Sequence, residues 1–314
     1  MRKLLYLLEQ TEYREDSLPE LPDGFVRTVL TENASADERL KEIADAEIVF
    51  GEPTIEELQN AKKLRWVQMF WAGADRYLHG GFPEGVTLTT ASGAFGETIA
   101  EHAIAMLFSL CRRLPQYGKA NDWHDAGCEK RITGATAMIY GCGDIGSEIA
   151  KRLKALGVRT IGVCRNARKN RPFFDALTTL SCASAFLPEA DFILCAMPSS
   201  EETDGYFDKE TLSLIKKDAV LINVGRGSLI DTNALTDCVK NGKFFGVGLD
   251  VTQPEPLPKE HPLWQCSNVI ITPHVAGVSF GHLHETEKKI MDICAENFRH
   301  YLKDEPLRNT VMIP

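Results

Sequence analysis

Residues 136–157 read TAMIYGCGDIGSEIAKRLKALG, and this stretch decides the fold. The apolar run TAMIY leads into GCGDIG at 141–146, and a helical pattern follows. A GxGxxG motif between a strand and a helix is typical of a βαβ unit that binds a dinucleotide. Gly141 permits the tight turn, Gly143 lets backbone amides approach a pyrophosphate, and Gly146 lets the helix pack closely on the strand. The phosphates are then expected at the positive helix N-terminus.

Short apolar runs alternate with helical patterns on both sides of this stretch. Before it, LLYLL, FVRTVL, EIVF, LRWVQMF and VTLTT are typical of strands, and 35–46 and 54–61 of short helices. From 136 onward, ATAMIYG, TIGVC, DFILCAM, AVLINVG, FFGVGLDV and NVIITPH repeat the pattern. Strands that alternate with helices predict an α/β fold with parallel sheets covered on both faces.

Two longer helices are also expected. Residues 96–114 are nearly continuously apolar, which predicts one long, largely buried helix. Arg112 and Arg113 would complement the negative end of its dipole, and Pro115 would stop it. Residues 283–303 predict a final amphipathic helix.

The composition is that of a globular protein with two cores. The chain has 314 residues, of which 44% are hydrophobic and 25% charged, and one core rarely serves such a length. Its net charge of −9 argues against nucleic-acid or anionic-membrane binding. We therefore expect a small-molecule partner.

The cysteines and the N-terminal residues indicate the compartment. Nine cysteines are scattered singly without a CxxC pair, which is typical of reduced thiols. The apolar stretch in MRKLLYLLEQ is too short for a secretory signal, so a first buried strand is expected there. No run is long enough to span a membrane, and a cytoplasmic protein is predicted.

A basic loop follows the expected strand at 159–164. Most NAD-binding proteins carry Asp or Glu at that strand end for the ribose hydroxyl, but here the chain continues Cys-Arg-Asn. Arg165, Arg168, Lys169 and Arg171 place four positive charges within seven residues. Such a loop attracts a 2′-phosphate and favours NADP(H) over NAD(H), with Arg165 as the first contact. The alternative, a solvated basic loop, stays open.

Three residues with catalytic chemistry come at or just after later strands. Arg226 lies between two glycines in LINVGRG, Glu255 lies in the proline-rich LDVTQPEPLP, and His274 ends NVIITPH. Ligands of doubly wound sheets bind at the carboxyl ends of strands, so all three are candidates for one site. Taken singly, the arginine could cap carbonyls and the histidine could simply end a strand.

The ordered motifs resemble the D-isomer-specific 2-hydroxyacid dehydrogenase family. The match runs through GCGDIG, NVGRGSLIDTNAL, GVGLDVTQPEPLP and HPLWQCSNVIITPHVAG, with weaker AGADRYL and GETIAEHAIAML upstream. The resemblance implies two Rossmann-like or flavodoxin-like domains with doubly wound sheets and an active-site cleft between them. A discontinuous substrate domain would comprise 1–98 and 284–314, and the dinucleotide domain 99–283. A homodimer is implied as well.

The family also implies roles for these side chains in reducing a 2-keto acid. Arg226 would bind the carboxylate and polarise the keto oxygen, which its planar fork suits. His274 would donate the proton in reduction and accept it in oxidation, and Glu255 would hydrogen-bond and orient the imidazole. Backbone amides of a loop would also bind the carboxylate, at Ala72, Gly73 and Ala74.

The expected cofactor contacts cover the glycine loop, the basic loop and two strand ends. They are Gly141, Gly143, Asp144, Ile145, Gly146, Arg165, Arg168, Pro198 and Asp250. The FWAGADR form of the substrate loop departs from the commoner family pattern and is similar to the glyoxylate- and hydroxypyruvate-reducing branch. Which 2-hydroxy acid is used stays open.

Other functions and sites rank lower. Formate dehydrogenases of this superfamily carry Gln where Glu255 stands, and dinucleotide-sensing corepressors related to the family keep the catalytic residues. Cys142 could be a reactive thiol beside the glycine turn, although a space-filling role is favoured. No metal is expected, since His282 and His284 have no second cluster of ligands nearby. His102 is expected to make a structural hydrogen bond.

Overall fold

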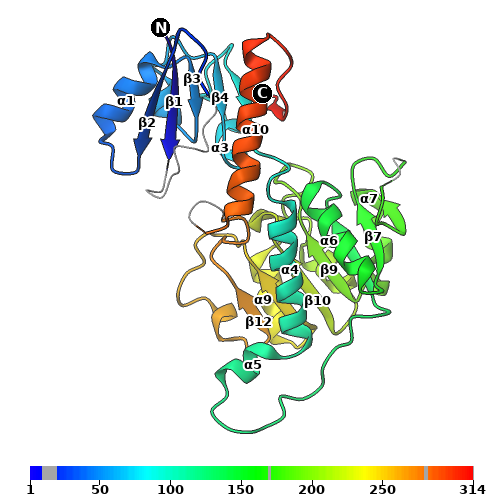
Figure 1. Ribbon diagram of the computed structural model, residues 1–314. Coiled ribbons are helices and arrows are strands. Elements are labelled where there is room, and N and C mark those ends of the chain that lie inside the picture. Colours follow the sequence, from blue (N-terminus) through cyan, green and yellow to red (C-terminus); the bar gives the residue numbers. More distant parts are fainter. Residues whose placement is uncertain (9–19, 169–170, 279–281, 314) are drawn as a thin grey trace. The chain divides into compact units, whose positions relative to one another are not determined.

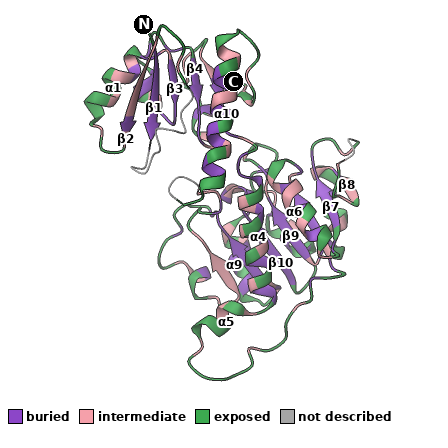
Figure 2. Cartoon of the chain, in the orientation of Figure 1, coloured by how far each residue is buried: buried purple, intermediate pink, exposed green. Residues whose placement is uncertain are grey.

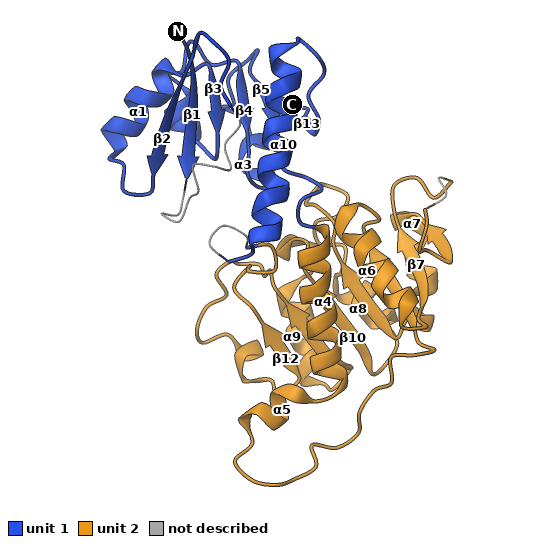
Figure 3. Cartoon of the chain, in the orientation of Figure 1, with its two compact units in different colours: residues 1–95, 278–314 blue, residues 96–277 orange. Residues whose placement is uncertain are grey.

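The computed structural model describes residues 1–8, 20–168, 171–278 and 282–313. They form two compact units, 1–95 with 278–314 and 96–277, coloured separately in Figure 3. The expected division at 98/99 and 283/284 differs from these bounds by three and six residues. Each unit has its own sheet, and each is described by itself.

The sheet of unit 1 has the order β13-β5-β4-β3-β1-β2. Its strands are β1 (Arg2–Leu8), β2 (Phe25–Thr31), β3 (Ile48–Phe50), β4 (Trp66–Gln68), β5 (Thr87–Thr89) and β13 (Thr310–Val311). The first five are parallel, in the order 2-1-3-4-5 of flavodoxin-like sheets. The short β13, which was not predicted, pairs antiparallel with β5 at the edge of the sheet.

Helices cover both faces of this sheet. They are α1 (Ala36–Asp45), α2 (Ile55–Leu58), α3 (Asp75–Leu78) and α10 (His284–Leu302). Alternate strand residues serve opposite faces, so Leu5 and Val49 join the cluster that contains Ile43 of α1. On the other face, the Phe298 ring of α10 lies 6.4 Å from that of Phe50, edge to face. This contact brings the last helix onto the first sheet.

A buried amide fastens α10 to β4 and to the C-terminal segment. Asn297 is fully buried, and its Nδ2 donates to Gln68 Oε1 at 2.8 Å and to the Arg308 carbonyl at 3.0 Å. Its Oδ1 accepts from the Arg308 amide at 2.7 Å. Buried polar groups need such partners, so this network specifies where the C-terminal segment joins unit 1.

The sheet of unit 2 has the order β12-β11-β10-β9-β6-β7-β8. Its strands are all parallel: β6 (Thr136–Tyr140), β7 (Arg159–Val163), β8 (Ala176–Thr178), β9 (Phe192–Cys195), β10 (Ala219–Asn223), β11 (Phe244–Leu249) and β12 (Val269–Ile271). This is the Rossmann order with one strand added. The predicted α/β class with doubly wound parallel sheets is confirmed.

Unit 2 buries both faces of its sheet (Figures 1 and 2). Its helices are α4 (Gly96–Cys111), α5 (Leu114–Lys119), α6 (Asp144–Ala155), α7 (Leu180–Ala183), α8 (Lys209–Leu214) and α9 (Thr232–Lys240), with 3₁₀ turns η2 (Ser184–Glu189), η3 (Gly227–Leu229) and η4 (Pro262–Gln265). Ile139 of β6 packs with α4 and α6, whereas its neighbour Tyr140 joins the cluster with α8 and α9. Strands buried on both faces explain the continuous apolar runs.

The long helix was predicted to cover 96–114 and to stop at Pro115, and this end was wrong. Helix α4 ends at Cys111, Arg113 adopts the left-handed conformation at φ 57°, and Pro115 lies in the first turn of α5. Proline is favoured at that position because the first amides of a helix need no intrahelical partner. Arg112 pairs with Glu129 at 2.6 Å, so its charge serves the following loop rather than the helix end.

Two further expectations concern composition. All nine cysteines are free, and five of them are buried. Within the described ranges, no helix is long and apolar enough to cross a membrane. Leu4–Leu8 are buried within β1, as expected for a core strand.

The Asn297 network predicts a large loss of stability on substitution. Asn297→Leu removes the partner of the buried Gln68 amide oxygen and of the Arg308 amide and carbonyl, and we expect a loss of about 2–4 kcal/mol in the free energy of unfolding. Urea unfolding followed by tryptophan fluorescence measures it. Asp292→Ala on the same helix breaks only an exposed ion pair with Lys288 and should cost less than about 1 kcal/mol. Equal effects of the two variants would show that the network is not stabilising.

Candidate active site

The glycine loop has the shape that a pyrophosphate needs. Gly141 has φ +98°, and a Cβ there would lie 2.6 Å from the Ala196 carbonyl oxygen. A Cβ on Gly146 would overlap the Gly141 carbonyl oxygen, so the helix packs directly on the turn. Gly143, the N-cap of α6, is exposed, makes no side-chain cap and has open space around it. The first turn of α6 therefore presents uncapped amides at its positive end, which fits a dinucleotide phosphate.

The two residues after Gly143 open the helix. Asp144 and Ile145 begin α6, and the Asp144 carboxyl lies against Gly96, the first residue of α4, closely enough to exclude any Cβ there. Acidic groups are stabilised at helix N-termini. Asp144 therefore links the starts of the two helices behind the glycine loop.

The basic loop lies at the end of β7, beside the glycine loop. The strand ends at Val163, and Arg165 and Arg168 are exposed, with the Arg168 amide bonded to Asn166 Oδ1 at 3.0 Å. Arg171 instead donates through Nη1 to the Cys142 carbonyl within the glycine loop. Lys169 lies outside the described residues. Arg171 thus ties the basic loop to the glycine loop, a contact that the sequence analysis did not foresee.

The environment of Cys142 favours a space-filling role. Its thiol is buried, with 4% of the residue exposed. Burial, with a smaller contribution from Cys164, raises its pKa to about 12. Since the thiolate is the reactive form, this cysteine is not an activated nucleophile.

Arg226 lies in a loop that glycines and an asparagine shape. Asn223, the last residue of β10, accepts from the Gly225 amide at 3.0 Å and donates to the Arg226 carbonyl at 2.8 Å. A Cβ on Gly227 would overlap the Thr252 carbonyl, so the loop after β10 packs directly on the loop after β11. The half-buried Arg226 guanidinium donates from Nη1 to the Gly225 carbonyl at 2.8 Å, which anchors it at this strand end.

Glu255 and His274 form a direct pair. Glu255 Oε1 lies 2.6 Å from His274 Nδ1, and the side chains are 42% and 51% exposed. The Glu255 loop contains two cis peptide bonds, before Pro254 and Pro256, and Thr252 Oγ1 donates to the Pro254 carbonyl at 2.8 Å. A short contact between groups that remain accessible is what a proton-transferring pair requires.

The buried Asp250 holds the segment that carries His274. Its Oδ1 accepts from the Thr272 hydroxyl at 2.6 Å and from the Val275 amide at 2.9 Å, and its Oδ2 accepts from the Ala276 amide at 3.0 Å. His274 between them has φ 55°, a conformation that is uncommon for a residue with a side chain. The carboxylate thus fixes the turn that presents the imidazole.

His102 extends this network, and the expected structural hydrogen bond is confirmed. Its Nε2 lies 3.1 Å from Thr272 Oγ1 and 3.8 Å from Asp250 Oδ1. Sequence reasoning missed Thr272 and Asn223, because their role depends on partners brought together by the fold. Asn223 ends β10 and Thr272 follows β12, so their position at a strand end was the signal that could have identified them.

The expected substrate loop lies in unit 1, after β4. Glu52 is buried and its Oε1 accepts from the amides of Phe70 at 2.8 Å and Trp71 at 3.1 Å. Trp71 in turn stacks on Phe95 with ring centroids 6.1 Å apart. These contacts shape the entry to the loop that contains Ala72, Gly73 and Ala74, all partly exposed.

The sheet order relates the remaining candidates in unit 2. Arg226, Glu255 and His274 follow β10, β11 and β12, which are neighbours in one parallel sheet. Pro198 follows β9, the next strand, and is exposed. Among the described residues, no group of three His, Cys, Asp or Glu side chains could hold a metal ion. The chemistry therefore gathers at the carboxyl edge of a Rossmann sheet, which is typical of a dinucleotide-dependent dehydrogenase.

Comparisons with known proteins agree with this class. The family model "D-isomer specific 2-hydroxyacid dehydrogenase, NAD binding domain" matches residues 104–276. A glyoxylate reductase of Pyrococcus horikoshii is 32% identical over 72% of this chain and 71% of its own length. Another from Korarchaeum cryptofilum is 31% identical over 82% of this chain and 78% of its own.

A solved structure covers nearly the whole chain. The D-isomer specific 2-hydroxyacid dehydrogenase family protein from Aeromonas salmonicida superposes with a TM-score of 0.85, at 30% identity, over 99% of each chain. The chain belongs to the D-isomer specific 2-hydroxyacid dehydrogenase family. It is an oxidoreductase that transfers a hydride between a nicotinamide dinucleotide and a 2-keto or 2-hydroxy acid.

Two glycines of the loop predict opposite effects of one methyl group. Gly146→Ala forces a Cβ into the Gly141 carbonyl and should cost more than about 3 kcal/mol of stability. Gly143→Ala meets open space and should cost less than about 1 kcal/mol, while its methyl group weakens coenzyme binding. Thermal unfolding and coenzyme titration of both variants check this. A stable Gly146→Ala variant would contradict the close packing of α6.

Proposed function

We propose that this enzyme reduces glyoxylate or hydroxypyruvate, with Arg226, Glu255 and His274 as its catalytic residues. The observation that carries the proposal is the 2.6 Å contact between His274 Nδ1 and Glu255 Oε1. The two archaeal relatives named above are glyoxylate reductases, which supports a small 2-keto acid as substrate.

His274 is the proton donor in this proposal. Its Nδ1 is engaged by Glu255, so Nε2 is the nitrogen left to exchange a proton with the substrate oxygen. In reduction Nε2–H protonates the developing alkoxide, and in oxidation Nε2 accepts the hydroxyl proton. The Glu255 carboxylate holds the ring orientation and stabilises the imidazolium.

Arg226 binds the substrate carboxylate and polarises the keto oxygen. A guanidinium offers several donors in a planar fork, which matches a 2-keto acid. The backbone amides of Ala72, Gly73 and Ala74 are proposed to bind the same carboxylate. When bound, the reduced nicotinamide supplies the hydride.

NADPH is the proposed coenzyme. The contacts are those of Gly141, Gly143, Asp144, Ile145 and Gly146 for the pyrophosphate, Arg165 and Arg168 for the 2′-phosphate, and Pro198 and Asp250 at the strand ends. Support comes from two observations at the end of β7: residues 164–166 include no acid, and Arg165 and Arg168 are exposed. The Asp250 carboxylate already accepts three hydrogen bonds, so its part toward the coenzyme is mainly to position the His274 turn.

The proposal includes a cytoplasmic homodimer. The free cysteines suit a reducing compartment. Formate oxidation and dinucleotide sensing are not favoured, because Glu255 stands where formate dehydrogenases carry Gln and the two relatives are named as reductases.

Turnover of keto acids tests the function. We expect loss of reduced-nicotinamide absorbance with glyoxylate or hydroxypyruvate, faster than with pyruvate or phenylpyruvate. His274→Ala should lower kcat by a factor of about 10²–10⁴, since a positioned acid is lost, while coenzyme affinity stays unchanged. His284→Ala, an exposed histidine at the start of α10, is the matched control. Tight coenzyme binding without turnover of any keto acid would refute the proposal.

The coenzyme preference has its own test. Arg165→Ala removes a cation expected at the 2′-phosphate, so the KM for NADPH should rise about tenfold or more, while that for NADH stays constant. Arg159→Ala, at the opposite end of β7, removes one exposed arginine without touching the loop. If Arg165→Ala changes neither KM, the basic loop is only solvated surface.

A further inference from the structure

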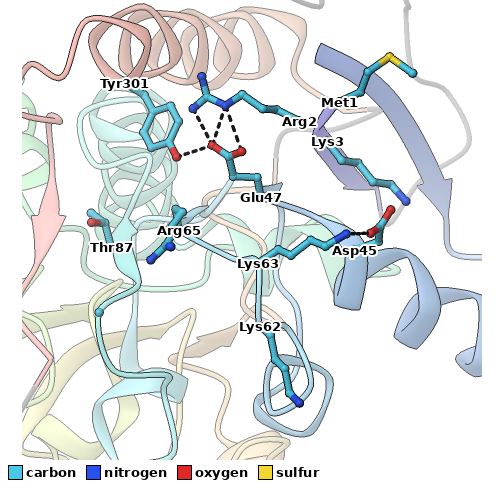
Figure 4. Close-up of a pocket in the computed structure, with 11 residues that line it drawn as sticks. Met1, Arg2, Lys3, Asp45, Glu47, Lys62, Lys63, Arg65, Thr87 and Tyr301 are labelled. Carbon is cyan, nitrogen blue, oxygen red and sulfur yellow. Dashed lines mark hydrogen bonds and ion pairs between the residues drawn. The ribbon is translucent and has the colours of Figure 1, made fainter. Parts of the chain in front are cut away.

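A polar pocket of about 710 Å³ lies in unit 1 where the parallel strands begin (Figure 4). Arg2 is the first residue of β1, Thr87 is the first of β5, and Arg65 directly precedes β4. The proposed substrate loop follows β4 at its other end. The pocket is therefore distinct from that loop, and nothing in the proposed reaction uses it.

Basic side chains dominate the lining. They are Arg2, Lys3, Lys62, Lys63 and Arg65, against the carboxylates of Asp45 and Glu47. The whole chain carries a net charge of −9, so five cations around one pocket run against its overall balance. Such a local concentration of one sign attracts an anion.

The Glu47 carboxylate is already paired with neighbouring side chains. Its Oε1 accepts from Arg2 Nη2 at 2.6 Å and from the Tyr301 hydroxyl at 2.8 Å, as the dashed lines in Figure 4 show. The hydrogen bonds from Arg2 hold the pKa of the Glu47 carboxyl below its usual range. Glu47 therefore stays ionised and paired, and it orients Arg2 rather than competing for a ligand.

The other carboxylates are paired as well. Lys63 bonds to Asp45, which lowers the pKa of that carboxyl, and Lys3 bonds to Glu42 next to the pocket. The Lys63–Asp45 pair is well exposed, with 67% and 58% of the side chains accessible, so it is weakly held. Three of the five cations are thus matched by three carboxylates.

Lys62 and Arg65 are the two lining cations outside these ion pairs, although Arg65 lies near enough to Glu47 to help lower the pKa of that carboxyl. Among the residues that the structure describes, neither side chain makes a hydrogen bond or ion pair, and both are exposed. The Thr87 amide donates to the Arg65 carbonyl at 2.9 Å, so these two residues are neighbours at the strand starts. The Arg65 guanidinium and the Thr87 hydroxyl therefore line the same part of the pocket.

We propose that this pocket binds a small phosphate-bearing metabolite, with Arg65 and Lys62 contacting the phosphate oxygens and the Thr87 hydroxyl donating to them. Two basic side chains outside ion pairs suit the charge of a phosphate dianion, and the guanidinium fork suits its oxygens. The volume lies within the range of about 300–1,000 Å³ typical of small-molecule sites.

Calorimetric titration of the full chain with inorganic pyrophosphate tests this site. Wild type should bind with a Kd of about 1 mM or lower. The double variant Arg65→Ala/Lys62→Ala should weaken that binding at least about tenfold, since charge-assisted hydrogen bonds are lost. Both residues are exposed, so the variant should fold normally. Lys41→Ala, an exposed lysine on α1 outside the pocket, is the matched control and should bind as wild type does.

The glycine loop is a second place where pyrophosphate could bind, and the double variant leaves it intact. The expected result is therefore that one class of pyrophosphate sites weakens at least about tenfold, with coenzyme affinity and keto-acid turnover unchanged. Equal binding by wild type and the double variant overturns the proposal. So does equal weakening by Lys41→Ala, which would show nonspecific attraction, and so does the absence of binding by wild type up to about 10 mM.

Discussion

The buried carboxylate of Asp250 is the constraint on which the catalytic end of unit 2 depends. It follows β11 and accepts three hydrogen bonds from the segment after β12. Those bonds hold His274 in a left-handed conformation that costs energy for a residue with a side chain. A neutral side chain at this position would leave two amides and a hydroxyl without an ionised acceptor. The orientation of the His274 imidazole therefore depends on a carboxylate that follows the neighbouring strand, β11.

Around the whole site, the side chains that position a loop differ from the side chains that are proposed to react. The positioning side chains are buried, such as Asn223 in the Arg226 loop and Glu52 beside the proposed substrate loop. Both accept hydrogen bonds from backbone amides. The groups proposed to react, His274 and Glu255, remain about half exposed. A buried polar group with all partners in place is rigid, and an accessible one can exchange protons with a ligand. The proposed catalytic pair combines the two properties because the buried groups that support it lie at the edge of the sheet.

Much of the fold could be predicted from the sequence because its signals are local. The glycine motif and the long apolar runs predicted β6, β9, β10 and β11 and the helix after the glycines. The strands β8 and β13 were not predicted; their assignment depends on pairing with β7 and with β5, which the sequence does not show. The predicted end of α4 was wrong because Arg113 adopts a left-handed conformation, which interrupts the helix before Pro115 and has no clear signal in the sequence. Contacts such as His102 with Thr272, separated by 170 positions, have no local signal at all.

The same contrast between local signals and contacts made by the fold separates the evidence for NADPH from the evidence for the proposed catalytic pair. The proposed coenzyme preference rests on residues adjacent in sequence, where the absence of an acid and the presence of arginines are visible before any fold is known. Arg171 adds a structural element, since its bond to the Cys142 carbonyl joins the basic loop to the glycine loop. A substitution in the basic loop should therefore also change the conformation of the glycine loop, and the reverse. The catalytic pair, by contrast, joins residues 19 positions apart through a proline-rich loop, and only the fold brings Glu255 to within 2.6 Å of His274.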